Sequence, residues 1–170
     1  FDELTATGLL DVAAVRFFGG QATGCGPIAS AFEAGQDVVR PVEKPETVVR
    51  SLAIGSPADG GYAIKQARES RAAILGVEDE ATIESIRLLA ETEGILTETA
   101  GGVTLAALRR AVDEGHIERH EETVLVITGN GIKTLDVLAT DDADTLPQPI
   151  APSFEAFEAW WGDSAQEAAA

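Results

Sequence analysis

The hydrophobic positions of this chain fall into two kinds of stretch, which alternate along the sequence. Some are short continuous apolar runs with the length of buried strands, and others repeat with the spacing of an amphipathic helix. The expected strands lie at 15–22, 72–77, 95–97 and 122–128, and the expected helices at 28–34, 61–70, 80–93 and 101–114. This alternation predicts an α/β fold, with an open, mainly parallel twisted sheet and helices on both faces.

The apolar run at 122–128 carries the most information, because four apolar residues, Val124 to Ile127, stand directly before Thr128-Gly129-Asn130-Gly131. Four β-branched or leucine residues in a row are too few for a helix and predict a strand buried on both faces. Ligands bind at the carboxyl ends of strands in open α/β sheets. The Thr128 hydroxyl can give or take one hydrogen bond there without bringing charge. A plain turn from strand to loop is the other interpretation.

Three loops should meet at the carboxyl ends of the strands: 23–27, 97–102 and 128–133. In the second loop, Gly101 and Gly102 open the helix expected at 101–114, where unpaired amides beside the helix dipole suit an anion or the edge of a cofactor ring. A tight turn explains the same glycine pair without a ligand. Asp79 stands where it can cap the helix at 80–93.

Composition limits the kinds of partner. The 170 residues are one domain or a large piece of a bigger protein, 45% hydrophobic, with a net charge of −17 from 29 acids and 12 bases. Such a surface repels phosphate backbones and anionic lipid, so we expect no nucleic acid and no membrane partner. A cytoplasmic location is the default, and the acidic surplus suits either a salt-loving protein or an ordinary acidic cytosolic one. We expect one domain portion at 1–138, followed by an acidic tail with proline and alanine at 139–170, in which Trp160 and Trp161 would dock if it orders.

Cysteine and histidine give no sign of a metal site. Cys25 stands alone between two glycines, with no base placed in sequence to activate it as a nucleophile. His116 and His120 have the spacing of neighbours on a helix, but no third ligand is near, so surface residues are the expected interpretation. No metal site is expected.

Four motifs, in this order and spacing, resemble the carboxyl-terminal half of threonine synthase. They are Gln21-Ala22-Thr23-Gly24-Cys25-Gly26-Pro27-Ile28, Ile54-Gly55-Ser56-Pro57, Thr92-Glu93-Gly94-Ile95-Leu96-Thr97-Glu98 and Thr128-Gly129-Asn130-Gly131-Ile132-Lys133. The resemblance covers about Phe1 to Leu138. That family belongs to the tryptophan-synthase-β-like, fold-type-II pyridoxal-phosphate enzymes.

The resemblance implies a pyridoxal phosphate cofactor and places cofactor-binding residues at Thr128, Gly55, Ser56, Glu98 and Gly101. In the family, the hydroxyl at the position of Thr128 hydrogen-bonds the pyridine nitrogen. A neutral partner leaves that nitrogen largely unprotonated, which tempers the cofactor as an electron sink. The family usually carries Asn at the place of Ser56, a Glu-Pro-Ala-Ser-like run in place of Glu98 to Gly101, and often His at Asn130. The two glycines at 101 and 102 would loosen the pocket wall.

The implied reaction converts O-phosphohomoserine and water to threonine and phosphate, in an enzyme that the resemblance makes a homodimer. The family's Schiff-base lysine lies in the amino-terminal half, and Lys133 matches a different family lysine. No catalytic residue is therefore expected in this chain, which we expect to be inactive alone, as a fragment, a split-gene product or a truncated one. The alternatives are a non-catalytic homologue that serves binding or oligomerisation, and a sister enzyme such as threonine dehydratase or cysteate synthase.

Overall fold

The structure is a computed structural model, and it describes residues 1–11, 15–138 and 150–167. Its contacts divide the chain into two compact units, Phe1–Leu138 and Ala139–Ala170. The first unit holds a parallel sheet and the helices that cover it, and the second holds a single described helix, α6 (Phe154–Glu167). Each unit is described by itself below.

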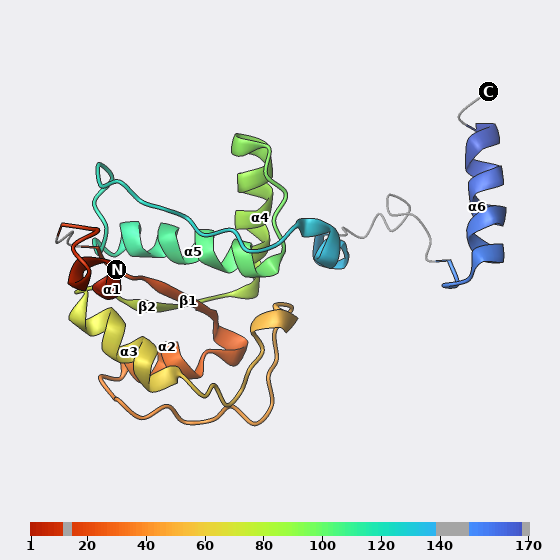
Figure 1. Cartoon of the computed structure of the whole chain (residues 1–170). Helices are drawn as coiled ribbons and strands as arrows, with labels where there is room; N and C mark the ends of the chain where they lie inside the picture. Colours follow the sequence, from red (N-terminus) through yellow and green to blue (C-terminus); the bar gives the residue numbers. More distant parts are fainter. Residues whose placement is uncertain (12–14, 139–149, 168–170) are drawn as a thin grey trace. The chain divides into compact units, whose positions relative to one another are not determined.

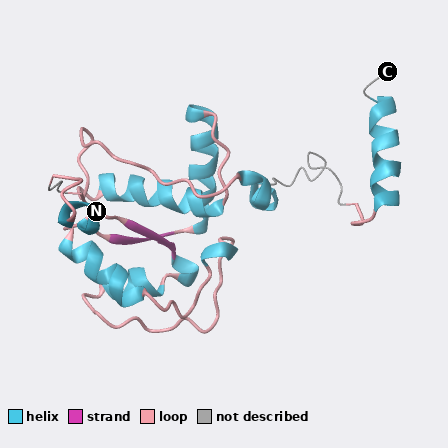
Figure 2. Ribbon diagram, in the orientation of Figure 1, coloured by secondary structure: helices cyan, strands magenta, loops and turns pink. Residues whose placement is uncertain are grey.

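A two-stranded parallel sheet lies at the centre of the first unit (Figure 2). Strand β1 (Gly19–Ala22) pairs with β2 (Ile74–Val77), so that the first residues of the two strands are partners, as are the last. All four residues of β2 are buried, as its run of apolar residues requires. The α/β class is confirmed, although both strands are shorter than the apolar runs that predicted them.

Helices cover both faces of this sheet (Figure 1). On one face, α5 (Thr99–Asp113) lies so close to β1 that a Cβ on Gly20 would stand 2.9 Å from the Ala107 Cβ. On the other face, α2 (Pro27–Glu33) and α3 (Gly60–Glu69) enclose a second apolar cluster that includes Ile64 and Ile74. The sheet therefore separates two small cores, in which alanine, valine and isoleucine do most of the filling.

Helix α4 (Asp79–Glu93) packs against α5 through Thr82 and Ile86, which face Gly102. The expected end of α4 is confirmed: Gly94 has φ of 68°, a left-handed conformation that favours glycine. The expected cap is wrong. The Asp79 carboxylate accepts hydrogen bonds from the Thr47 hydroxyl, at 2.5 Å, and the Val48 N–H, at 2.8 Å. It fastens the loop before η2 (Arg50–Leu52) to the start of α4, because those donors compete successfully with the helix's own amides.

The strand predicted at 122–128 does not form. Val124 is 85% exposed and Val126 is 61% exposed, whereas the prediction placed this run inside the sheet. A strand needs a neighbour for its backbone, and no backbone hydrogen bond joins 122–128 to another described residue. The strand predicted at 95–97 likewise reduces to one isolated antiparallel bridge, Thr97 with Asn130.

The remaining described elements are short. Helix α1 (Asp2–Ala6) begins the first unit, η1 (Thr23–Cys25) follows β1, and η3 (Gly131–Leu138) ends the unit. In the second unit, Phe157, Trp160 and Trp161 lie against one another on α6, with ring centroids 6.1 to 6.3 Å apart. Trp160 and Trp161 are nevertheless 40% and 60% exposed, so their main partners among the described residues are each other and Phe157.

Candidate functional site

Two of the three loops expected to meet do lie side by side. The segments 96–98 and 129–131 run antiparallel, with Thr97 opposite Asn130. Two backbone hydrogen bonds join them: Glu98 N–H to Gly129 C=O, 3.1 Å, and Gly131 N–H to Leu96 C=O, 3.0 Å. The loop that carries Thr128 is therefore anchored to the start of α5, as the sequence predicted.

Glu98 occupies the centre of this junction. Its side chain is only 12% exposed, and its carboxylate lies beside Gly129, where any Cβ would overlap Glu98 Oε1. Lys133 Nζ stands 3.4 Å from Glu98 Oε2 and is itself 64% exposed. The Thr97 hydroxyl adds a hydrogen bond of 3.3 Å to the Gly129 carbonyl. A side chain at 129 would therefore have to displace the Glu98 carboxylate from this position.

The amides of Gly101 and Gly102, which we expected to be unpaired, are bonded inside the chain. Both donate to the Glu98 carbonyl, at 3.0 and 3.2 Å. A Cβ at Gly101 would overlap the Thr97 hydroxyl, so this glycine serves close packing and does not open a pocket wall. The buried Thr99 hydroxyl next to it has no hydrogen-bond partner among the described residues, and the Thr99 N–H donates to Thr134 Oγ1 at 3.3 Å.

Thr128 itself is exposed, at the end of the unpaired run 122–128. No hydrogen bond joins its hydroxyl to another residue that the structure describes. This is the arrangement that a hydroxyl free to bind a ligand requires, beside a polar junction made by Glu98 and Lys133.

Gly55 and Ser56 lie on a separate loop, and no described hydrogen bond or ion pair joins them to Thr128, Glu98 or Gly101. The Gly55 carbonyl accepts the Val42 N–H at 2.9 Å, and Ser56 is exposed. Just before them, η2 contacts α5, and Arg50 of η2 pairs with Asp136 of η3 at 2.8 Å. This exposed ion pair links η2, which precedes the loop of Gly55, to the segment that follows Thr128.

The third expected loop, 23–27, is bonded to other segments. The Thr23 hydroxyl donates to Glu78 at 2.7 Å, and a Cβ on Gly24 would overlap the Glu46 carbonyl. Cys25 is 1% exposed, which leaves it inaccessible as a nucleophile. Within the described residues, no hydrogen bond or ion pair joins this loop to the other two, so its meeting with them stays a prediction.

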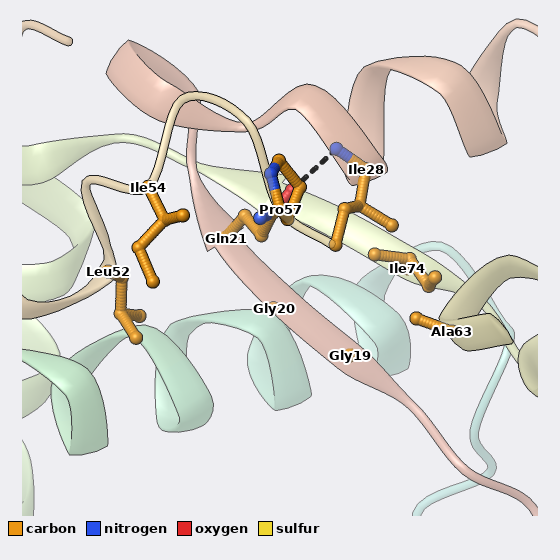
Figure 3. Close-up of a pocket in the computed structure, with 9 residues that line it drawn as sticks. All are labelled: Gly19, Gly20, Gln21, Ile28, Leu52, Ile54, Pro57, Ala63 and Ile74. Atoms are coloured by element: carbon orange, nitrogen blue, oxygen red, sulfur yellow. Dashed lines mark hydrogen bonds between the residues drawn. The ribbon is translucent and has the colours of Figure 1, made fainter. Parts of the chain in front are cut away.

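An apolar groove, which we call the β1 groove, runs beside β1 with a volume of about 280 Å³ (Figure 3). Its lining comes from two strands, two α-helices, η2 and the loop after η2: Gly19, Gly20, Gln21, Ile28, Leu52, Ile54, Pro57, Ala63 and Ile74. The polar member, Gln21, is already engaged, because its Oε1 accepts the N–H groups of Ile28 and Ala29 at 2.9 and 3.0 Å. The groove offers hydrophobic contact and little chemistry.

Sequence reasoning missed a second polar anchor on α5. Arg110 Nη1 donates to the Gly76 carbonyl at the end of β2, at 2.6 Å, and to Glu33 of α2 at 3.0 Å, while its Nε donates to Glu114 at 2.7 Å. The hydrogen bond from Arg110 lowers the pKa of Glu114, and attraction to the guanidinium adds to it. No local signal marks an arginine that reaches across a sheet edge, and the partners are far apart in sequence.

Metal chemistry and membrane spanning find no support in the parts of the chain described. Across 1–11, 15–138 and 150–167, no cluster of three or more histidine, cysteine, aspartate or glutamate side chains could hold a metal ion. No described helix has the length and apolar character that crossing a membrane requires.

The sequence matches a family model, that of the pyridoxal-phosphate dependent enzymes, over residues 5–129. The chain therefore belongs to this family, whose cofactor is pyridoxal phosphate. Threonine synthase of Mycobacterium tuberculosis is 32% identical over 152 residues, which are 89% of this chain and 40% of that protein. Threonine synthase of Methanocaldococcus jannaschii is 35% identical over 136 residues, 80% of this chain and 33% of that protein.

Solved structures agree in fold. Threonine synthase from Escherichia coli superposes with a TM-score of 0.56 over 84% of this chain and 32% of that one, at 19% identity. A fungal L-serine ammonia-lyase from Rhizomucor miehei gives 0.57 over 78% of this chain and 42% of that one, also at 19% identity. At this identity the likeness concerns the fold. The chain thus spans at most 40% of the length of the threonine synthases just compared.

The residues present fit one edge of a pyridoxal phosphate ring. Thr128 offers an exposed hydroxyl next to the polar junction, which suits a ring heteroatom. The lysines do not offer an equally clear partner for the aldehyde: Lys133 is paired with Glu98, Lys65 with Glu69 at 3.8 Å, and Lys44 lies in the exposed loop before Pro45.

Proposed function

We propose that this chain is the carboxyl-terminal, cofactor-binding portion of a threonine synthase, which converts O-phosphohomoserine and water to threonine and phosphate. The observation that supports the proposal is the junction of 96–98 with 129–131, which holds Gly129, the residue after Thr128, against the start of α5. Identity of 32 to 35% to threonine synthases over most of the chain supports the choice of this enzyme within the family.

In this proposal, the Thr128 hydroxyl binds the pyridine nitrogen and orients the ring. Glu98 and Gly101 shape the junction behind it, and Gly55 and Ser56 approach from the loop after η2. When bound, the cofactor stabilises negative charge on the substrate carbons. A neutral hydroxyl partner for the ring nitrogen moderates that capacity, which suits a reaction that must add water after phosphate has left.

In this proposal, the other catalytic and substrate-binding groups of the enzyme lie outside this chain. The Schiff-base lysine and the groups that hold the substrate phosphate belong to the remainder of the enzyme, since the chain corresponds to 40% of the tuberculosis protein. This chain alone would be inactive. We further propose a cytoplasmic enzyme that works as a homodimer, on the resemblance to threonine synthases.

The test uses the full reading frame that encodes this chain, expressed and assayed for phosphate release from O-phosphohomoserine. Thr128→Val keeps the shape of the side chain and removes its hydrogen bond. An unpaired buried ring nitrogen costs about 1–3 kcal/mol, so cofactor affinity or turnover should fall by roughly tenfold or more. Thr128→Ser is the matched control, because it keeps the hydroxyl and should retain most of both.

Three results would contradict the proposal. Dehydration of serine or threonine without phosphate release would indicate a sister enzyme such as threonine dehydratase. Conversion of O-phosphoserine and sulfite to cysteate and phosphate would indicate cysteate synthase. No turnover on any of these substrates would indicate a non-catalytic homologue that serves binding or oligomerisation.

A further inference from the structure

Few contacts fix the position of Thr128 directly. Residues 122–128, which precede and include it, make no backbone hydrogen bond to another described residue. The nearest anchored position is Gly129, whose carbonyl accepts from the Glu98 N–H and the Thr97 hydroxyl. Whatever fixes Gly129 therefore also limits where Thr128 can lie.

The Glu98 side chain contacts Gly129 a second time, through its carboxylate. This carboxylate fills the space where a side chain at 129 would be, and only 12% of the Glu98 side chain is exposed. A nearly buried carboxylate needs a compensating charge, and it would otherwise repel the electron-rich carbonyls around it. In a chain with 29 acids and 12 bases, such compensation must come from a specific base.

Lys133 supplies that charge from the far end of the same turn. Its Nζ lies 3.4 Å from Glu98 Oε2. The turn between Asn130 and Lys133 is closed by two further bonds, from the Ile132 N–H to Asn130 Oδ1 at 2.9 Å and from the Lys133 N–H to the Asn130 carbonyl at 3.4 Å. The ion pair thus clamps both ends of the Gly129–Lys133 turn against the start of α5.

We propose that Glu98 and Lys133 form a positioning pair, which holds the Thr128 loop in register with α5 and keeps the charge beside Thr128 balanced. The pair acts through Gly129 and touches no reacting atom. The role of the pair in catalysis rests on the proposed function, because Thr128 is the residue that the pair positions. The effect of the pair on the loop is independent of that function, so this effect can be measured on this chain without cofactor.

The measurement is amide hydrogen exchange, followed by NMR, at Glu98 and Gly131, whose N–H groups bridge the two segments. Lys133→Gln should raise the exchange rates of these two amides by about twofold to tenfold, as expected for loss of an ion pair with one partly buried member. Lys133→Arg should restore slow exchange, because it keeps the charge. Raising the salt to 1 M should shrink the difference between Lys133→Gln and the parent, since the lysine is exposed.

Two controls separate positioning from general destabilisation. Lys65→Gln removes a lysine that pairs with Glu69 within α3, and it should leave the Glu98 and Gly131 amides unchanged. The Ile64 amide, in the core of α3, should exchange at the parent rate in Lys133→Gln. The double variant Glu98→Gln with Lys133→Gln should be no worse than the worse of the two singles, because both remove one interaction.

The proposal is overturned if Lys133→Gln leaves both bridging amides unchanged, if Lys133→Arg behaves like Lys133→Gln, or if the faster exchange spreads equally to Ile64. A chain that shows the loop effect, in an enzyme that releases no phosphate from O-phosphohomoserine, would retain the positioning pair and remove the proposed function. An enzyme that releases phosphate from O-phosphohomoserine, in a chain without the loop effect, would retain the proposed function and remove the positioning pair.

Discussion

The contact between α4 and α5 leaves no room for a side chain at Gly102, and this sets the cost of Gly102→Ala. An ideal Cβ there would stand 2.7 Å from Ile86 Cγ1 and 2.7 Å from the Thr82 carbonyl oxygen. Thr82 and Ile86 are both 0% exposed, so neither can move into solvent. Alanine favours a helix over glycine by about 1 kcal/mol, whereas overpacking a core costs about 1–3 kcal/mol.

The overpacking term wins here because one of the two atoms is a backbone oxygen of a helix, which moves only with its helix. We expect Gly102→Ala to lower the free energy of unfolding by up to about 2 kcal/mol, which corresponds to a fall in Tm of up to roughly 8 °C. Urea unfolding followed by circular dichroism measures the first, and a thermal scan in the same buffer measures the second.

Gly61→Ala is the matched control, since Gly61 also lies in a helix but has no atom closer to its ideal Cβ than the Asp37 carbonyl oxygen, at 3.9 Å. There the helix preference acts alone, so stability should stay level or rise by up to about 1 kcal/mol. If Gly102→Ala proves as stable as Gly61→Ala, the two helices are not packed as closely as described and the argument fails.

Three further predictions concern the whole chain. Pyridoxal phosphate added to the chain alone should not form a Schiff base with one particular lysine, because we expect the Schiff-base lysine outside this chain. An absorbance band near the visible edge that disappears when a single lysine is substituted would refute this prediction. Tm should rise clearly from dilute buffer to 1 M KCl, since a net charge of −17 repels itself and the Debye length shrinks to about 3 Å; a flat or falling curve would count against it. Arg110 lowers the pKa of Glu114, so the stability from this exposed pair is present above the ordinary glutamate value of 4.5 and is lost as the pH falls through the lowered pKa. In thermal scans across that pH range, the Tm of Glu114→Gln should fall less steeply with falling pH than the Tm of the parent. Equal slopes of Tm against pH would contradict a stabilising Arg110–Glu114 pair.

The helices were predictable because their signals are local. The apolar spacing within 80–93, followed by Gly94, predicts α4 to within one residue of its observed start, and 61–70 does nearly the same for α3. The approach of the Thr128 loop to Glu98 was also expected, but from two parallel strands that do not form; the two segments meet in one antiparallel bridge instead. The helix inferences need only short stretches of sequence.

Other features depend on partners that sequence does not name. The apolar side chains of Val124 and Val126 predict burial in a sheet, yet no strand among the described residues lies beside them. Asp79 could cap α4 or bind the loop at Thr47, and the choice follows from tertiary contact. Glu98 is predicted to lie beside the cofactor, and that prediction does not include the contact of its carboxylate with Gly129 and Lys133, which only the folded backbone defines.

The exposed valines at 124 and 126 change what salt does to this protein in solution. An unpaired apolar run with free backbone groups is a template for association with a second molecule. At low salt, the charge of −17 keeps molecules apart. The screening that strengthens each folded chain removes this protection, so conformational stability and colloidal stability should move in opposite directions as salt is added. Preparations at molar salt are therefore best kept dilute.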